Sequence, residues 1–465
     1  MKVLGGELMS WKLYLKNNKD KFINDLSQFV SIPSISAIDD HFDDVVRAGN
    51  WVANRLQLAG IKNARLISTE THPVVYGDNL EAGNTKPTIL IYGHFDVQPV
   101  DPLKLWDKPP FDPYIKNGKI YGRGASDDKG NMLAPILAVE AILKSNSKLP
   151  VNIKFLFEGQ EEIGSPTLMP FIRKNANLLK SDMIFSADGG QFGEKQPNLI
   201  RGLKGLLAFE LIVTGAKTDQ HSGKHGGGIA NPAQALSQII SSMKDLSGKI
   251  SIEGFYNDVL ELNDDDRAAI AKIPFNDTEY AEALGVDEPF GETGYSTSER
   301  LAIRPTLEIN GMHSGYQGKG IKTVLPSKAF AKISCRLVAN QKPKEIYKLV
   351  EKHIHKHSPL GVTVEVRKLP SEANPFLVPR GHNSSEVVRK VLRELYNKEP
   401  FEVYVGGSIP ILSMFLEEFG VHGAVMSFGL DDEKVHAPNE FFRLSSFSRA
   451  QSAYCMLIEE FGKNC

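Results

Sequence analysis

The stretch Thr88-Ile-Leu-Ile-Tyr-Gly-His-Phe-Asp96 decides the fold of this 465-residue chain, because it joins an apolar run to polar residues. Residues 88–92 are almost entirely apolar, which is typical of a strand buried on both faces of a parallel sheet. His94 and Asp96 follow directly, where the strand ends. Ligands of open α/β sheets bind beyond the carboxyl ends of the strands, so this position predicts a functional site.

Three more apolar runs are followed by acidic residues or histidine. Strands that alternate with helices indicate one largely parallel sheet, and in such a sheet these ends lie along one edge. A single Asp or His after a strand is usually a turn residue or a helix cap, but their coincidence at one edge favours a shared metal site. The runs and the residues that follow them are 151–157 with Glu161 and Glu162, 183–187 with Asp188, and 423–428 with His436.

The residue types also select the ion. Between the first two strands, a glycine-rich loop over 121–130 carries Asp127 and leads into a predicted helix over 131–144. Histidine and carboxylate ligands without cysteine suit Zn²⁺, with Mn²⁺ and Co²⁺ as alternatives. Five or more ligands exceed the number that one tetrahedral zinc accepts, so two divalent metal ions are expected, with Asp127 as the bridging carboxylate.

The remaining polar residues of these segments can support the chemistry. Glu161 and Glu162 are adjacent, so their side chains point to opposite sides if the segment is extended. One of them can therefore bind metal while the other faces the bound water as a general base. Asp96, two residues after His94, lies on the same side of the chain and can orient the imidazole.

The composition excludes several classes of protein. The chain has 54 Lys and Arg against 56 Asp and Glu, without the basic excess of a nucleic-acid or anionic-membrane binder. No apolar run reaches membrane-spanning length, and residues 1–21 lack the apolar core of a signal peptide. Three cysteines are too few for a disulfide framework. We therefore expect a cytoplasmic protein with no nucleic-acid or membrane partner.

Two helices are predicted before the first strand. Apolar residues at helical spacing indicate one helix over 11–29, which the Ser-Ile-Pro segment at 31–33 ends. A second helix is predicted over 43–59, with Gly60 at its C-cap.

The middle of the chain has a different pattern. Residues 329–338 and 363–367 alternate apolar and polar positions, which is typical of antiparallel strands with one exposed face. Helices are predicted at 232–246 and 344–357. A second domain of α+β type is therefore expected at about 202–382, inserted into the first.

These segments resemble those of the M20 family of metallopeptidases, the co-catalytic zinc aminoacylase/carboxypeptidase clan, and within it the carnosinase-like cytosolic dipeptidases. The resemblance implies a mostly parallel-sheet catalytic domain, formed by 1–201 and 383–465, with helices on both faces. It also implies an inserted α+β (ferredoxin-like) lid and dimerisation domain over 202–382. The matching segments run in order along almost the whole chain. They are Gly93–Pro99, Tyr121–Gly130, Glu158–Ser165, Ser186–Gly189 and Val435–Glu440.

The resemblance also implies a role for each residue of the cluster. Glu161 would be the general base, and Asp96 the carboxylate behind the metal-binding histidine. The peptide between Asp127 and Asp128 is expected to be cis. The implied ligands are His94, Asp127 and Asp188 for one ion, and Asp127, Glu162 and His436 for the other.

The inserted domain carries further matches. His221 lies in an Asp-Gln-His-Ser-Gly segment that resembles the lid motif of the family. It would reach the active site of the neighbouring subunit of a homodimer and stabilise the oxyanion. Thr323 and Arg336 lie in segments that resemble those gripping the substrate carboxylate. A Gly-Gly-Ser-Ile-Pro segment resembles the loop that contacts the substrate backbone, with Ser408 as the contact.

The function implied is metal-dependent hydrolysis of the amide bond of dipeptides or short peptides with a free C-terminal carboxylate. Val405 departs from the dipeptidase branch, which commonly has an acidic residue just before the Gly-Gly pair. This departure favours the alternative of an N-acyl-amino-acid deacylase of the acetylornithine or succinyl-diaminopimelate type. The presence of Glu161 with every expected ligand argues against a third reading, an inactive metal-binding scaffold.

Overall fold

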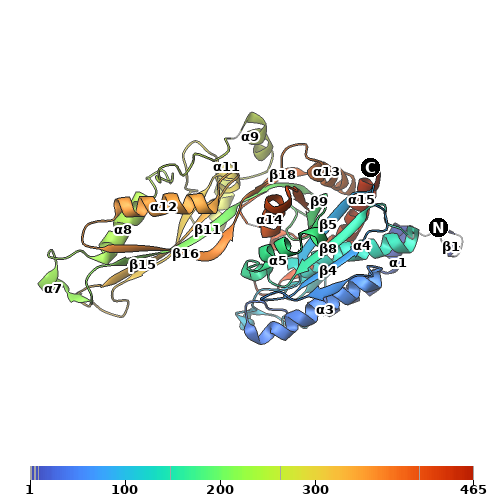
Figure 1. Cartoon of the computed structure of the whole chain (residues 1–465), viewed down its shortest axis with the longest axis horizontal. Helices are drawn as coiled ribbons and strands as arrows, with labels where there is room; N and C mark the ends of the chain where they lie inside the picture. Colours follow the sequence, from blue (N-terminus) through green and yellow to red (C-terminus); the bar gives the residue numbers. More distant parts are fainter. Residues whose placement is uncertain are drawn as a thin grey trace. The chain divides into compact units, whose positions relative to one another are not determined.

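The chain forms two compact units, coloured along the sequence in Figure 1. The computed structural model describes residues 3–4, 7–8, 10–146, 148–261, 263–407 and 409–463. Unit 1 comprises Met1–Arg201, Val378–Glu402 and Ile409–Cys465, and unit 2 comprises Gly202–Leu377 and Val403–Ser408. The catalytic and lid roles assigned to these parts of the chain stay predictions.

Unit 1 is built on a six-stranded, mostly parallel sheet, as predicted. In spatial order its strands are β19 (Gly423–Val425), β9 (Met183–Ser186), β5 (Thr88–His94), β8 (Asn152–Glu158), β4 (Val74–Asn79) and β3 (Arg65–Ile67). The pairs β19–β9, β9–β5 and β5–β8 are parallel, whereas β8–β4 and β4–β3 are antiparallel. The four parallel strands therefore end at the same edge.

Helices cover both faces of this sheet. Alternate residues of β5 point to opposite faces, so Ile89 and Ile91 join the main apolar core while Leu90 lies on the other side. The main core is shared with α3 (Phe42–Ala59), α4 (Asn131–Asn146), α13 (Asn383–Tyr396) and α15 (Leu444–Lys463). On the other face, α14 (Pro410–Phe419) packs against β9, β19 and α5 (Leu168–Lys174).

The single helix predicted over 11–29 is wrong. The segment forms α1 (Trp11–Asn17) and α2 (Lys19–Val30), which are separated at Asn18. There the backbone leaves the helical region (φ −107°, ψ 11°), and the side-chain amide of Asn18 donates to the carbonyl of Tyr14 at 2.9 Å. Asparagine competes with the helix through such local hydrogen bonds.

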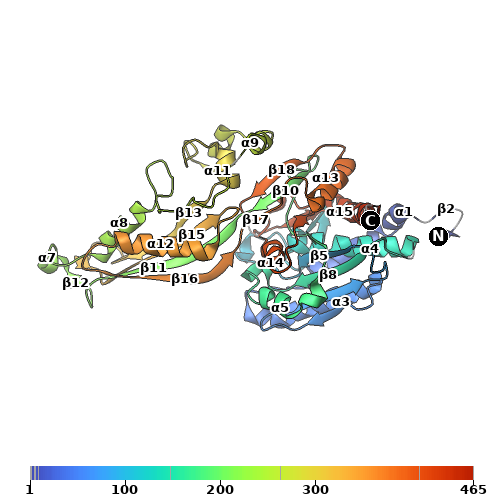
Figure 2. The same ribbon diagram turned by 45° about the horizontal axis from the view of Figure 1, so that its top comes forward.

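Unit 2 contains a four-stranded antiparallel sheet with two helices along one face (Figure 2). In spatial order the strands are β13 (Thr306–Ser314), β15 (Lys328–Leu337), β11 (Gly205–Thr214) and β16 (Thr363–Ala373). The helices are α8 (Pro232–Ser242) and α12 (Pro343–His357). Along the chain these elements follow the order β-α-β-β-α-β, which is the predicted ferredoxin-like arrangement.

Smaller elements complete the two units. Among the described residues, no helix combines the length and the apolar character that crossing a bilayer requires. The remaining strands are β1 (Val3–Leu4), β2 (Glu7–Leu8), β6 (Tyr114–Lys116), β7 (Lys119–Tyr121), β10 (Asn198–Leu203), β12 (Gln220–His221), β14 (Val324–Leu325), β17 (Phe376–Leu377), β18 (Phe401–Val405) and β20 (Phe441–Arg443). The remaining α-helices are α6 (Ala176–Leu179), α7 (Ser222–His225), α9 (Asp264–Ala271), α10 (Asp277–Leu284) and α11 (Thr297–Ile303).

Candidate metal centre

The carboxyl ends of three strands of unit 1 carry most of the predicted ligands. His94 is the last residue of β5 and is fully buried. Glu161 and Glu162 open a 3₁₀ turn just after β8, and Asp188 follows β9 by two residues. Because these strands are parallel and adjacent, all four side chains lie along one edge of the sheet.

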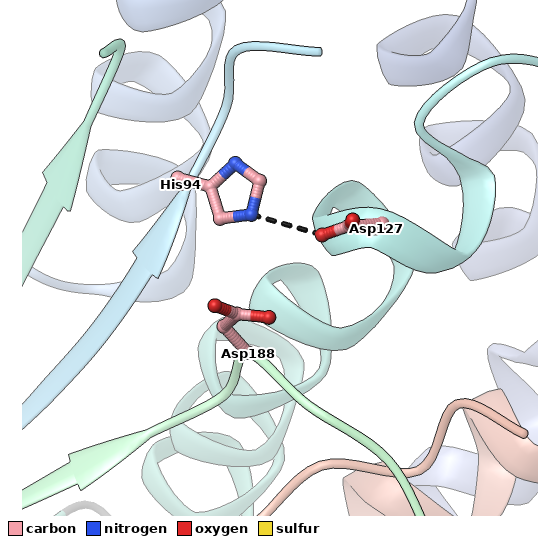
Figure 3. A group of neighbouring side chains, drawn as sticks. All are labelled: His94, Asp127 and Asp188. Atoms are coloured by element: carbon pink, nitrogen blue, oxygen red, sulfur yellow. Dashed lines mark hydrogen bonds and ion pairs between the residues drawn. The ribbon is translucent and has the colours of Figure 1, made fainter. Parts of the chain in front are cut away.

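Asp127 lies in the glycine-rich turn that precedes α4. The segment Ala125–Gly130 forms a π-helical turn in which the backbone of Asp127 is not helical (φ −114°, ψ 95°). The peptide between Asp127 and Asp128 is cis, as predicted. Figure 3 shows the carboxylate of Asp127 pointing toward the imidazole of His94, with the carboxylate of Asp188 beside them.

Two clusters of possible metal ligands share the Asp127 carboxylate. In the first, the ligand atoms of His94, Asp127 and Asp188 lie within 4.8 Å of one another, and His94 Nε2 is 3.0 Å from Asp127 Oδ1. In the second, Asp127, Glu162 and His436 meet the same limit. His436 Nε2 lies 3.0 Å from Asp127 Oδ2 and 3.2 Å from Glu162 Oε2. Each oxygen of Asp127 thus faces a different cluster, as a bridging carboxylate requires.

Asp96 supports both sides of this arrangement. Its Oδ1 lies 3.4 Å from Nδ1 of His94, the ring nitrogen that does not face Asp127. The same carboxylate accepts the backbone N–H groups of Glu161 (3.2 Å) and Glu162 (3.0 Å). Asp96 therefore orients the turn that holds the two glutamates, in addition to its predicted contact with the imidazole.

Gln98 holds the candidate ligand Glu162, although Gln98 is not among the predicted site residues. Its Nε2 donates to the Oε2 of Glu162 at 2.8 Å and to the backbone carbonyl of Glu162 at 3.2 Å. His94, Asp96 and Gln98 are spaced by two residues, and this alternation is the sequence signal that could have found it.

Burial and nearby negative charges shift the pKa values of Glu161, Glu162 and Asp188 upward. Burial raises the pKa of Glu161 well above its usual range, and the nearby carboxylates of Asp188 and Glu162 add to the effect. Burial and then the charge of Asp127 raise the pKa of Asp188 to about 7. Uncompensated negative charge is therefore costly at this edge of the sheet, and a bound cation would relieve it.

Neighbouring carboxylates raise the pKa values of the two histidines. Burial disfavours the charged ring of His94, but hydrogen bonds to Asp127 and Asp96 outweigh it and raise its pKa well above the usual range. Hydrogen bonds to Asp127 and Glu162 raise the pKa of His436 to about 10. Nε2 of each ring lies 3.0 Å from an oxygen of Asp127, and a divalent cation can take the place of a proton shared between such atoms. The donor set therefore fits a pair of such ions.

A cavity of about 460 Å³ opens beside the cluster within unit 1. That volume falls in the range of small-molecule sites in proteins. Its lining includes the Asp127 and Asp188 carboxylates, so a substrate held there would contact the candidate metal ligands. Other residues that line it are Ser126, Gly189, Asp431 and Lys434.

Two of the other predicted site residues are neighbours in unit 2. His221 is exposed at the end of β12, and its Nδ1 accepts a hydrogen bond from the backbone N–H of Gly223 at 3.0 Å. Thr323 is also exposed, and its carbonyl accepts from the N–H of Ser222 at 3.1 Å. Their contact with substrate stays a prediction.

Arg336 lies in the sheet of unit 2. It is half-buried on β15, opposite Leu206 of β11. Burial, together with the charges of Arg336 and Arg304, lowers the pKa of the Lys204 ammonium group to about 8. The surroundings of Arg336 are therefore cationic. Ser408 lies outside the described residues.

Comparison with known proteins gives matches along nearly the whole chain. A model of peptidase family M20/M25/M40 matches residues 90–460. The chain is 31% identical to Cys-Gly metallodipeptidase dug1 of Schizosaccharomyces pombe, over 97% of this chain and 98% of that protein. It is 29% identical to human Beta-Ala-His dipeptidase, over 92% and 87% of the two chains. The crystal structure of the M20 family metallo-carboxypeptidase Sso-CP2 from Sulfolobus solfataricus superposes with a TM-score of 0.84 at 34% identity, covering 96% of this chain and 100% of that one.

Metal binding by the ion-free protein is expected to release protons and to tighten as the pH rises. A cation must displace the protons held by His94 and His436, whose pKa values are raised, so fewer protons oppose binding at higher pH. Between pH 6 and 8 the Kd for Zn²⁺ should fall about tenfold per pH unit for each proton displaced. Calorimetric titrations in buffers of different ionisation enthalpy measure this release. Binding that is independent of both pH and buffer would contradict the assigned ligands.

Proposed function

The chain belongs to peptidase family M20/M25/M40, and we propose that it hydrolyses the amide bond of dipeptides or short peptides with a free C-terminal carboxylate. It is a metallopeptidase of this family, and the relatives named Cys-Gly metallodipeptidase and Beta-Ala-His dipeptidase support peptide substrates. The observation that carries the proposal is the position of Glu161, beside two ligand clusters that share one carboxylate.

Two divalent ions are proposed as cofactors, with Zn²⁺ preferred over Mn²⁺ and Co²⁺. Histidine and carboxylate donors suit all three metals, and zinc accepts them in the small coordination number that each cluster provides. When bound, such a pair supplies a Lewis acid for the scissile carbonyl and lowers the pKa of water. The proposed ligands are His94, Asp127 and Asp188 for one ion, and Asp127, Glu162 and His436 for the other.

Glu161 moves the proton in the proposed mechanism. Its carboxylate accepts a proton from the attacking water and then donates that proton to the nitrogen of the leaving amine. Burial raises its pKa, so the group can hold the proton between these two steps. Asp96 supports the role by accepting the Glu161 backbone N–H at 3.2 Å, which fixes the direction of the turn.

His221 is proposed to stabilise the oxyanion. Because its Nδ1 accepts a hydrogen bond from the backbone N–H of Gly223, the proton of the neutral ring lies on Nε2. This tautomer presents an N–H donor on an exposed side chain, and a donor is what a developing oxyanion needs.

A homodimer formed through unit 2 is proposed to bring His221 to a neighbouring active site. The strand β13 lies at the edge of the four-stranded sheet and is mostly exposed. Its exposed apolar residues include Ile309 and Met312. An open edge of this kind is a template for pairing with another chain, and a second copy of this chain is the proposed occupant.

The substrate carboxylate is proposed to bind Arg336, with Thr323 and Ser408 as further substrate contacts. The cationic surroundings of Arg336 and Lys204 support this assignment, because charge-assisted hydrogen bonds to a carboxylate are the strong ones. A cytoplasmic location is proposed as well, since Cys335 and Cys455 are buried free thiols.

Val405 is the reason to retain a second candidate function, the hydrolysis of N-acyl amino acids. An uncharged side chain at this position does not pair with the free amino group of a dipeptide, and this favours N-acylated substrates. The resemblance to the metallo-carboxypeptidase Sso-CP2 fits a substrate that is recognised through its C-terminal carboxylate. Dipeptides therefore remain the first proposal, and N-acyl amino acids the second.

Replacement of Glu161 by Gln is expected to lower kcat about 10²- to 10⁴-fold while both metal ions stay bound. The amide cannot take up the proton, yet it removes no proposed ligand. Activity and metal content are measured together, with E162Q as the matched control that should lose metal. An E161Q variant with wild-type kcat and full metal content would exclude Glu161 as the base.

Replacement of Arg336 by Met is expected to raise KM for free dipeptides about 10- to 100-fold, since charge-assisted hydrogen bonds worth about 1.5–3 kcal/mol are lost. Peptides with a C-terminal amide should be poor substrates of both forms. The control is R367M, on strand β16 of the same sheet, which should leave KM unchanged. The same assays include N-acetyl and N-succinyl amino acids, and faster hydrolysis of these would replace the first proposal by the second.

Mixing H221A with E161Q is expected to restore activity if two subunits share each site. Each variant alone should be nearly inactive, but in a mixed dimer the H221A subunit has an intact Glu161 and receives His221 from its partner. One site in each mixed dimer then works, which gives about a quarter of wild-type activity after random exchange. Mixed dimers that are confirmed by mass but remain inactive would rule out sharing.

A further inference from the structure

Glu440, four residues after His436, is a fully buried acidic residue that the mechanism above does not use. Its carboxylate accepts four hydrogen bonds from the loop that carries the bridging Asp127. The donors to Oε2 are Arg123 Nη1 (2.7 Å) and the N–H of Gly124 (3.0 Å), and the donors to Oε1 are the N–H groups of Ser126 (3.0 Å) and Asp127 (3.1 Å). The backbone carbonyl of Glu440 also accepts from the N–H of Gly122 at 3.0 Å.

The glycine-rich loop is shaped around this carboxylate. Gly124 has a left-handed backbone (φ 81°), and a Cβ there would lie 2.3 Å from Cγ1 of Val97. Successive backbone N–H groups that converge in such a turn form a binding site for an anion. In this protein the anion is the side chain of Glu440, so the loop binds a carboxylate from its own chain.

The opposite charges of Arg123 and Glu440 compensate each other. Both side chains are 1% exposed, and the guanidinium also donates to the carbonyl of Pro99 at 3.1 Å. Because the two charges are adjacent and opposite, their combined field at the candidate metal centre is small. Any effect of Glu440 on that centre therefore acts through the position of the backbone it holds.

We propose that Glu440 is a positioning residue that fixes the carboxylate of Asp127 relative to His436. Three residues link Glu440 to His436 on one side, and a direct hydrogen bond links it to the N–H of Asp127 on the other. It thereby sets the separation of Asp127 Oδ2 and His436 Nε2, which is 3.0 Å. The inference rests on the proposed two-metal site, because these two residues are proposed ligands of one ion.

Glu433 provides a matched control. It is also fully buried and lies in the same C-terminal segment, and its Oε2 accepts a hydrogen bond from the hydroxyl of Ser126 at 2.7 Å. Its other donors are the backbone N–H groups of Leu430 (3.1 Å) and Arg443 (3.2 Å) and the guanidinium of Arg443. Glu433 thus contacts the same loop without receiving the backbone N–H of Asp127.

The test compares metal binding by the full-length wild type, E440Q, E440D and E433Q after removal of metal. Zn²⁺ is titrated by calorimetry, and unfolding temperatures are recorded for each protein. E440D is included because E440Q leaves the buried guanidinium of Arg123 without a counter-ion. We expect at least one Zn²⁺ ion to bind about 10- to 100-fold more weakly in the Glu440 variants, and excess metal to restore part of the kcat of E440D. In E433Q the affinities for both Zn²⁺ ions should stay within about threefold of those of the wild type.

Three results would overturn the proposal. Wild-type affinities in folded Glu440 variants would remove its basis, as would an equal loss of affinity in E433Q. An E440D protein that does not fold would make Glu440 a residue required for folding instead of a positioning residue. A wild type that binds no metal would refute the proposed metal site itself, which is a different outcome.

Discussion

The carboxylate of Asp127, the proposed bridging ligand, is the group on which the rest of the candidate site depends. Its Oδ1 faces His94 and its Oδ2 faces His436, each at 3.0 Å. Hydrogen bonds from these two rings outweigh the effect of burial and hold the pKa of Asp127 below its usual range. The carboxylate therefore stays ionised while burial raises the pKa values of Glu161 and Asp188 around it. Asp127 thus differs from Glu161 and Asp188, for which burial favours the neutral form.

The sheet explains why these groups can lie so close together. Parallel strands β5, β8 and β9 end at one edge, and each carries a proposed ligand or the proposed base at its last residue or within the four residues after it. The two proposed ligands on loops, Asp127 and His436, need separate support, because they do not follow directly from a strand of this sheet. The buried Glu440 provides it, through hydrogen bonds to the backbone around Asp127 and through the short segment that joins it to His436. The sheet thus places His94, the two glutamates and Asp188, whereas a buried contact between loops holds Asp127 and His436.

Local patterns in the sequence are sufficient to predict the strands and the polar residues at their ends. They are insufficient to predict the contact between the loops. The apolar run 88–92 and the alternation of His94, Asp96 and Gln98 are local, so the strand and its polar end can be predicted from them. The contact between Arg123 and Glu440 joins residues 317 positions apart, and no periodicity relates such positions. The break at Asn18 depends on one competing hydrogen bond, which apolar spacing does not register. The antiparallel strand β3 has only three residues, and the second half of β4 is Gly-Asp-Asn, so neither stands out as an apolar run.

The charges of the site also connect metal binding to the proposed catalysis. A general base must be ionised before it can accept a proton, yet burial and neighbouring carboxylates raise the pKa of Glu161. Positive charge beside Asp188 and Glu162 lowers the cost of ionising Glu161, because opposite charges favour the charged form. In the proposed mechanism, the cations that would activate water would also favour deprotonation of Glu161, the residue that receives its proton. Removal of the ions would therefore, in the proposed mechanism, withdraw both the activated water and the positive charge that favours the ionised base.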